Sequence, residues 1–114
     1  MNLTSFARPV LLRRAKKIDR YFTHAEEIQR AVLARLIKNA AKTEWGQKYG
    51  YADLKSYEDF AATVPLNDYE TLKEPIDRMR HGEKDVLCKG RVKWYAKSSG
   101  TTNDKSKFIP VSKA

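Results

Sequence analysis

A four-residue apolar repeat in the first half of the chain constrains its fold more than any other feature. The repeat and its apolar neighbours comprise Ile28, Val32, Leu33, Leu36, Ile37 and Ala40. This spacing places the side chains on one face of an α-helix, so we predict a helix over residues 25–42. Thr23 and Glu26 match a capping box at its start. A preceding apolar stripe predicts another helix over residues 9–22, with Pro9 in its first turn.

Shorter helical elements are predicted further along the chain. Two glycines within residues 44–51 break the long helical pattern. Ser56 and Asp59 form a second capping box, which predicts a short helix after it. Asn67 or Asp68 can cap one further turn, and Pro75 suits the first position of the last helix.

Short strands are predicted after this helical region, which spans residues 9–82. Residues 91–96 alternate apolar and polar side chains as a strand does, and residues 85–88 form a shorter candidate. Residues 108–111 are expected to be extended around a proline. The fold within this chain is therefore α+β. Because a two-stranded hairpin is marginal alone, we expect the sheet to continue in sequence beyond the chain.

Positive charge is concentrated in the first half of the chain. The net charge is +9; residues 1–50 hold 11 Lys and Arg against 4 Asp and Glu, and residues 51–114 hold 12 against 10. This balance is compatible with a small basic helical module that binds nucleic acid, with a solvated helix face, or with an interaction fragment that has no ligand. The basic stretch 8–17 lacks the aromatic and amide side chains that read bases, which argues against nucleic acid. The acid-free residues 1–18 leave a targeting segment open.

Cysteine content and hydropathy indicate the cellular compartment in which the protein is expected. Cys88 is the only cysteine, so no intrachain disulfide forms, which favours a cytoplasmic setting. No apolar run is long enough to span a bilayer, so we expect no membrane partner. His24 and His81 show no metal-ligand spacing and are expected at helix ends.

The polar segment between the last two predicted strands carries the strongest chemical signal. Four hydroxyl side chains surround one glycine, in the order Ser98, Ser99, Gly100, Thr101 and Thr102. Glycine lets the backbone approach a ligand closely, and successive backbone N–H groups can bind an anion. Lys105 and Lys107 add positive charge that suits a polyphosphate. From these residues alone, a Ser/Thr-rich linker remains an equal alternative.

A Walker-type loop is a weaker explanation of the same segment. Gly100 followed by Lys105 and Ser106 approximates that motif, but Asp104 stands where its second glycine is required. The motif also needs a helix directly after the lysine, whereas residues 108–111 are predicted to be extended.

The segment SSGTTNDKSKFIP, residues 98–110, resembles the first nucleotide-binding motif of the adenylate-forming superfamily. Lys107 followed by Pro110 makes it most similar to the Gretchen Hagen family of auxin-responsive acyl acid–amido synthetases and their bacterial relatives. Upstream segments resemble that family in the same order, namely residues 45–50, 56–60, 64–66, 68–70, 79–83 and 96–102. Asp104 departs from the pattern, since many members have glycine there.

The resemblance implies a ligase that activates a carboxylic acid with ATP as an acyl-adenylate and then joins it to an amino acid. Residues 1–114 would form the N-terminal part of the large adenylating domain of an α/β enzyme, with strand, loop and strand over residues 85–111. The phosphates of ATP are expected at Ser98, Ser99, Gly100, Thr101, Thr102 and Lys107. Mg²⁺ would help neutralise them. No catalytic or metal-ligating residue is expected within the chain, so the chain alone would be inactive.

Overall fold

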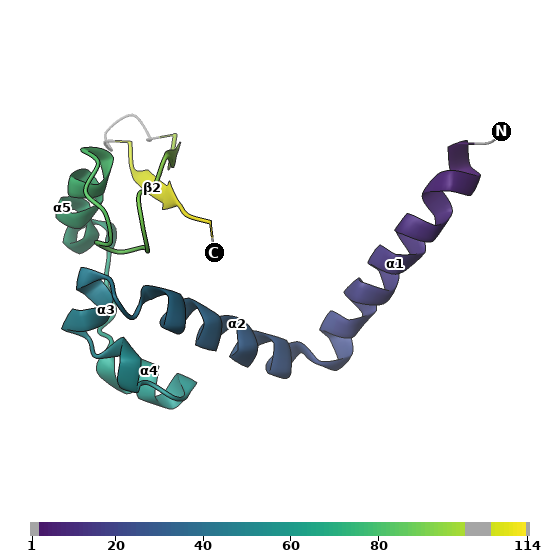
Figure 1. Ribbon diagram of the computed structural model, residues 1–114, viewed down its shortest axis with the longest axis horizontal. Coiled ribbons are helices and arrows are strands. Elements are labelled where there is room, and N and C mark those ends of the chain that lie inside the picture. The colour runs from purple at the N-terminus through teal and green to yellow at the C-terminus, as the bar shows by residue number, and fades with distance from the viewer. Residues whose placement is uncertain (1–2, 100–105, 114) are drawn as a thin grey trace. The chain divides into compact units, whose positions relative to one another are not determined.

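The structure of the protein is a computed structural model that describes residues 3–99 and 106–113. The chain forms two compact units, Met1–Val32 and Leu33–Ala114, and α2 continues from the first into the second (Figure 1). The elements are α1 (Leu3–Thr23), α2 (Ala25–Ala40), α3 (Glu44–Lys48), the 3-10 helix η1 (Tyr51–Asp53), α4 (Tyr57–Thr63), α5 (Tyr69–Arg80), β1 (Trp94–Lys97) and β2 (Phe108–Val111). The predicted order of helices followed by strands is confirmed.

Helix α1 begins earlier than predicted, at Leu3 instead of Pro9. Pro9 therefore lies inside the helix, where its missing N–H removes one backbone hydrogen bond. The capping box predicted at Thr23 is wrong, because the Thr23 hydroxyl lies 3.5 Å from the carbonyl oxygen of Asp19 and 3.4 Å from that of Arg20. The Thr23 hydroxyl thus contacts the last turn of α1 and Nδ1 of His24, 2.7 Å away, instead of capping the next helix.

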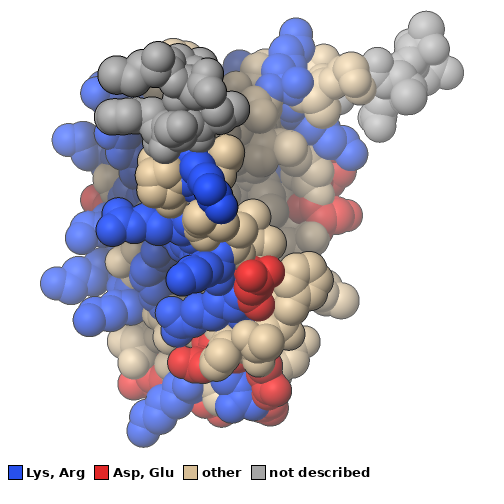
Figure 2. All heavy atoms as spheres, turned by 90° about the vertical axis from the view of Figure 1, so that its right-hand side faces the viewer, with Lys and Arg blue, Asp and Glu red and all other residues tan. Residues whose placement is uncertain are grey.

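Helix α1 exposes both apolar and basic side chains. The exposed large apolar residues are Val10, Leu11, Leu12, Ile18, Tyr21 and Phe22. The basic residues are Arg8, Arg13, Arg14, Lys16, Lys17 and Arg20. Lys and Arg side chains cover much of the face drawn in Figure 2, with Asp and Glu in smaller separate patches. In the part of the chain that the structure describes, no helix combines the length and the apolarity needed to cross a membrane.

Helix α2 confirms the apolar repeat and ends at Ala40, two residues before the predicted end. Its residue Ile37 is buried. The glycine-containing segment that follows forms α3, a short helix that the sequence did not predict. Thr43 caps it by accepting the N–H of Gly46 at 3.0 Å. Gly46 is required at this position, because a Cβ atom there would lie 2.0 Å from the carbonyl oxygen of Ala40.

The N-termini of α3 and α4 are stabilised in different ways. The predicted capping box of Ser56 and Asp59 is present at α4, with both reciprocal hydrogen bonds at 3.1 Å. Residues 85–88 do not form the predicted strand. Instead, the carbonyl oxygen of Asp85 accepts the N–H of Glu44, the first residue of α3, at 2.7 Å. This segment therefore satisfies a free N–H group at a helix end instead of joining the sheet.

Helix α5 is one continuous helix, whereas the sequence predicted a separate turn followed by a helix starting at Pro75. Asp68 caps it by accepting the N–H of Thr71 at 2.9 Å. Pro75 is the seventh of its twelve residues and is buried. We attribute the continuity to this cap and to the burial of Ile76 and Met79, which offset the hydrogen bond lost at Pro75.

Strands β1 and β2 form a two-stranded antiparallel sheet with one exposed apolar face. The register pairs Trp94 with Val111 and Ala96 with Ile109, so these four side chains share a face. Trp94 is 76% exposed, and Ile109 and Val111 are each 53% exposed. This face is not covered by any described residue.

The opposite face of the sheet lies against the core beside α5 (Figure 1). Tyr95 of β1 packs against a buried cluster of Met79, Val86 and Val92. Met79 belongs to α5, whereas the other two members come from the segment between α5 and β1. The core thus fixes the hairpin relative to α5.

Candidate functional site

The hairpin brings together the two ends of the predicted phosphate loop. Ser98 follows β1 and Lys107 precedes β2. The N–H of Ser98 donates to the carbonyl oxygen of Lys107 at 2.9 Å, and the N–H of Lys107 donates to Oγ of Ser98 at 3.0 Å. The Ser98 hydroxyl keeps a proton that it can donate to a ligand. Ser99 is exposed beside it. The other predicted site residues lie outside the described residues, and they are Gly100, Thr101 and Thr102.

The ammonium group of Lys107 lies beside an aromatic ring. Its Nζ atom is 5.7 Å from the centroid of the Tyr69 ring, within the range of a cation–π contact. No ion pair of the described residues includes Lys107. Because its charge is not matched by a carboxylate in that part of the chain, Lys107 is suited to an anionic ligand.

Phe108, the residue after Lys107, is held by both ends of α5. Its N–H donates to Oη of Tyr69 at 2.9 Å. The guanidinium carbon of Arg80 lies 3.7 Å from the centroid of its ring, and Nζ of Lys97 lies 6.0 Å from it. Tyr69 and Arg80 are the first and last residues of α5. Arg80 is paired with Asp77 at 3.0 Å, so the positive charge at the base of the loop that favours anions comes from Lys97 and Lys107.

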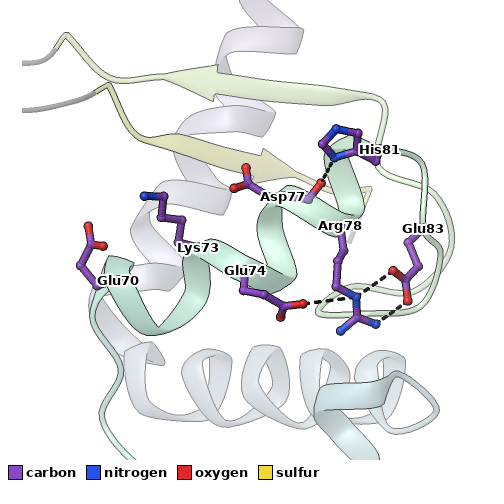
Figure 3. A pocket seen from close by; sticks show the side chains of 7 residues that line it. All are labelled: Glu70, Lys73, Glu74, Asp77, Arg78, His81 and Glu83. Carbon is purple, nitrogen blue, oxygen red and sulfur yellow. Dashed lines mark hydrogen bonds and ion pairs between the residues drawn. The ribbon is translucent and has the colours of Figure 1, made fainter.

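An open groove of about 590 Å³ borders another part of α5 (Figure 3). It is lined by Glu70, Lys73, Glu74, Asp77, Arg78, His81 and Glu83. Four carboxylates against one lysine and one arginine give this groove a net negative charge. In Figure 3, Glu74 and Arg78 point away from the two strands. A triphosphate is repelled by such a surface, so the groove does not extend the phosphate site.

Arg78 is the centre of an ion network in this groove. Its guanidinium donates to both carboxylate oxygens of Glu44, at 3.0 and 2.5 Å. Its Nε donates to Glu83 at 2.8 Å and lies 3.7 Å from Glu74. The hydrogen bonds from Arg78 lower the pKa values of Glu44 and Glu83. The same hydrogen bonds, first to Glu83 and then to Glu44, raise the pKa of Arg78. Because the network joins α5 to the N-terminus of α3, Arg78 is a structural cation.

Local structure accounts for the histidines and the cysteine. Nδ1 of His81 lies 2.7 Å from the carbonyl oxygen of Asp77, and Nδ1 of His24 lies 2.7 Å from the Thr23 hydroxyl. Burial raises the pKa of the Cys88 thiol, which disfavours the reactive thiolate. Within the described part of the chain, no three His, Cys, Asp or Glu side chains are grouped to hold a metal ion.

Tyr69 and Arg80 are the two residues near the loop that the sequence did not predict. Tyr69 lies 39 residues before Phe108, and no local spacing signals a contact over that separation. The segments 68–70 and 79–83, which contain Tyr69 and Arg80, resemble the family, but the resemblance implies no contact of either residue with the loop. The contact exists because the core places the hairpin alongside α5.

Comparison with known families agrees with the loop motif. Residues 14–114 match the GH3 family N-terminal domain. The chain belongs to the GH3 family. GH3 is the Gretchen Hagen family that residues 98–110 and the upstream segments resemble, so the recognition from sequence is confirmed.

Two curated relatives and one solved structure show how much of a GH3 protein is covered. Indole-3-acetic acid-amido synthetase GH3.6 of Arabidopsis thaliana is 30% identical over 95 residues, which are 82% of this chain and 16% of that protein. The 4-substituted benzoates-glutamate ligase GH3.12 of the same plant is 30% identical over 96 residues, 83% of this chain and 16% of the ligase. The solved structure of the GH3.15 acyl acid amido synthetase matches with a TM-score of 0.77 and 27% identity, over 86% of this chain and 18% of that chain. The chain thus spans less than a fifth of these relatives, and the predicted fold is confirmed for that part.

Proposed function

We propose that this chain provides the ATP phosphate-binding loop of a GH3-type acyl acid–amido synthetase. The observation that carries the proposal is the closure of the loop by the reciprocal hydrogen bonds of Ser98 and Lys107, with the Lys107 ammonium unmatched by a described carboxylate. Membership of GH3 supports ligase chemistry, since the relatives are named as amido synthetases and a ligase. The nucleic-acid alternative has no support beyond the charge of α1.

The loop would act mainly in the first half-reaction. A substrate carboxylate attacks the α-phosphorus of ATP, the bond to the β-phosphate oxygen breaks, and pyrophosphate leaves. Ser98, Ser99, Gly100, Thr101 and Thr102 hold the phosphates through hydroxyl and backbone N–H groups, and Lys107 supplies positive charge at the β/γ end. Stabilising the charge that develops on the leaving pyrophosphate favours this step. The amine then attacks the acyl carbon, loses a proton and displaces AMP.

The names of the relatives differ in their acids, so the proposal names a class and not a compound. One relative is named for indole-3-acetic acid and another for 4-substituted benzoates. We therefore propose a carboxylic acid and an amino acid as substrates. We propose that Mg²⁺ accompanies ATP and helps to neutralise its phosphates.

The test is pyrophosphate release by the protein expressed from its complete reading frame. We expect release with ATP and at least one member of a panel of carboxylic acids. Lys107→Ala is expected to lower the rate on the order of 100-fold, because one charge-stabilising contact is lost. Lys84→Ala, at an exposed lysine after α5, is the matched control and should behave as wild type. A folded protein that releases no pyrophosphate with any acid contradicts the proposed activity, and a fully active Lys107→Ala variant contradicts the loop assignment.

A further inference from the structure

We propose that Tyr69 is a positioning residue of the ATP site, which holds Lys107 and the start of β2 against α5. The inference rests on the proposed function of the loop. It starts from a single side chain that contacts two consecutive residues: Oη of Tyr69 accepts the N–H of Phe108 at 2.9 Å, and its ring lies 5.7 Å from Nζ of Lys107.

The hydrogen bond to Tyr69 secures the edge of β2 that faces away from β1. Adjacent residues of an extended strand direct their N–H groups to opposite edges. The N–H of Lys107 points to β1, where it reaches Oγ of Ser98. The N–H of Phe108 points away from β1 and donates to Oη of Tyr69. The carbonyl oxygen of Lys107, in the same peptide unit as the N–H of Phe108, accepts the N–H of Ser98 at 2.9 Å, so Tyr69 and Ser98 fix this unit from both sides.

Tyr69 is itself well placed to act as a fixed support. It is the first residue of α5, directly after Asp68, whose side chain caps the helix. Its side chain is half-buried. The helix end therefore sets where the hydroxyl lies, and the hydroxyl sets where the backbone before β2 lies.

Arg80 provides a second, independent support for the same strand. Its guanidinium lies over the Phe108 ring at 3.7 Å, from the opposite end of α5, roughly 16 Å along the helix axis from Tyr69. Loss of the Tyr69 hydroxyl should therefore loosen the backbone at Phe108 without detaching the hairpin. Because charge stabilisation depends on exact placement of the cation, the loosening should weaken the contact of Lys107 with ATP.

The experiment uses Tyr69→Phe in the complete protein, which keeps the ring and removes only the hydroxyl. Tyr57→Phe is the matched control, because Tyr57 is also the first residue of a capped helix but is 63% exposed. We expect faster hydrogen exchange at the Phe108 amide and a KM for ATP raised roughly 3- to 10-fold, as for the loss of one hydrogen bond. The KM for the acid should stay unchanged in both variants.

A double-mutant cycle separates positioning from a general structural role. In a Lys107→Ala background, Tyr69→Phe should have no further effect on the KM for ATP, because its target is gone. Additive losses would overturn the inference, and so would unchanged exchange at the Phe108 amide. If the wild-type protein releases no pyrophosphate at all, the proposed function fails and the positioning role fails with it. The exchange result still decides whether Tyr69 anchors the strand.

Discussion

Arg78 belongs to α5 and Lys107 lies beside its first residue, yet the surroundings of these two cations differ. Arg78 is surrounded by the carboxylates of Glu44, Glu74 and Glu83. Lys107 lies beside the ring of Tyr69, and no described carboxylate pairs with it. The charge of Arg78 is neutralised by ion pairs that join α5 to α3, whereas the charge of Lys107 remains available for an anion. The difference teaches that the neighbours of a basic side chain, and not its type, indicate whether it serves the fold or a ligand.

Both regions depend on one core residue, and removing it should produce the largest effect on stability. Met79 of α5 is 1% exposed and packs against Val86 and Val92 of the segment before β1. Met79→Ala should lower the free energy of unfolding by about 2–5 kcal/mol, through lost burial and a cavity. Hydrogen exchange should then increase both at the N-terminus of α3 and at β2. Leu66→Ala, at a fully exposed side chain, is the control. Wild-type protection in either region would show that this region does not depend on Met79.

A substitution in α3 should disturb the Arg78 region and leave the Lys107 region intact. In Gly46→Ala the new Cβ would lie 2.0 Å from the carbonyl oxygen of Ala40, so the backbone of α3 has to move. We expect a loss of about 1–3 kcal/mol, as for other overpacked sites. Amide hydrogen exchange should become faster around Glu44 but not at Phe108. Equal increases at both places would contradict the separation of the two regions.

Acid should weaken the ion network around Arg78, in addition to the helix caps formed by Asp59 and Asp68, whose pKa values are also lowered by hydrogen bonds. Hydrogen bonds from Arg78 lower the pKa values of Glu44 and Glu83 below the ordinary value of 4.5. Their contribution to stability is therefore present above that value and is lost as the pH falls through the lowered values. Thermal melting between about pH 6 and pH 3 should show this loss, and Arg78→Met should flatten the profile in that window. If the melting temperature falls as steeply with acid in Arg78→Met as in wild type, other groups cause the loss of stability.

The smallest expected effect is on the hairpin side. The hydroxyl of Tyr95 is buried and has no hydrogen-bond partner among the described residues. Tyr95→Phe removes this unsatisfied group and should leave stability unchanged or raise it by up to about 1 kcal/mol. Chemical denaturation of both proteins provides the measurement. A clear loss of stability would indicate that the hydroxyl does have a partner.

The sequence predicted elements whose signals are local. The apolar repeat around Ile37 and the capping box at Ser56 were confirmed because periodicity and caps depend only on near neighbours. Pro9 and Pro75 were misplaced as helix starts. Burial of Ile76 and Met79 can offset the hydrogen bond missing at Pro75, and this burial depends on tertiary packing that a local pattern does not show. Residues 85–88 failed as a strand because they bond to α3, which is distant in sequence.

The candidate site was predicted in part for the same reason. The loop composition and the family resemblance pointed to Ser98 and Lys107, which the hairpin register brings together. Tyr69 and Arg80 were missed because they reach Phe108 through tertiary packing. A local pattern can thus indicate which residues meet a ligand, but not which residues hold them in place.

Protection of Lys107 by nucleotide tests the central claim most directly. Lysines of the complete protein would be acetylated with a limiting reagent, with and without saturating ATP, and the modified sites read by mass spectrometry. We predict that ATP slows acetylation of Lys107 and leaves the exposed Lys84 unaffected. AMP, which lacks the β- and γ-phosphates, should protect Lys107 much less. Equal acetylation of Lys107 with and without ATP, in a protein that binds ATP, would contradict its assignment to the phosphate site.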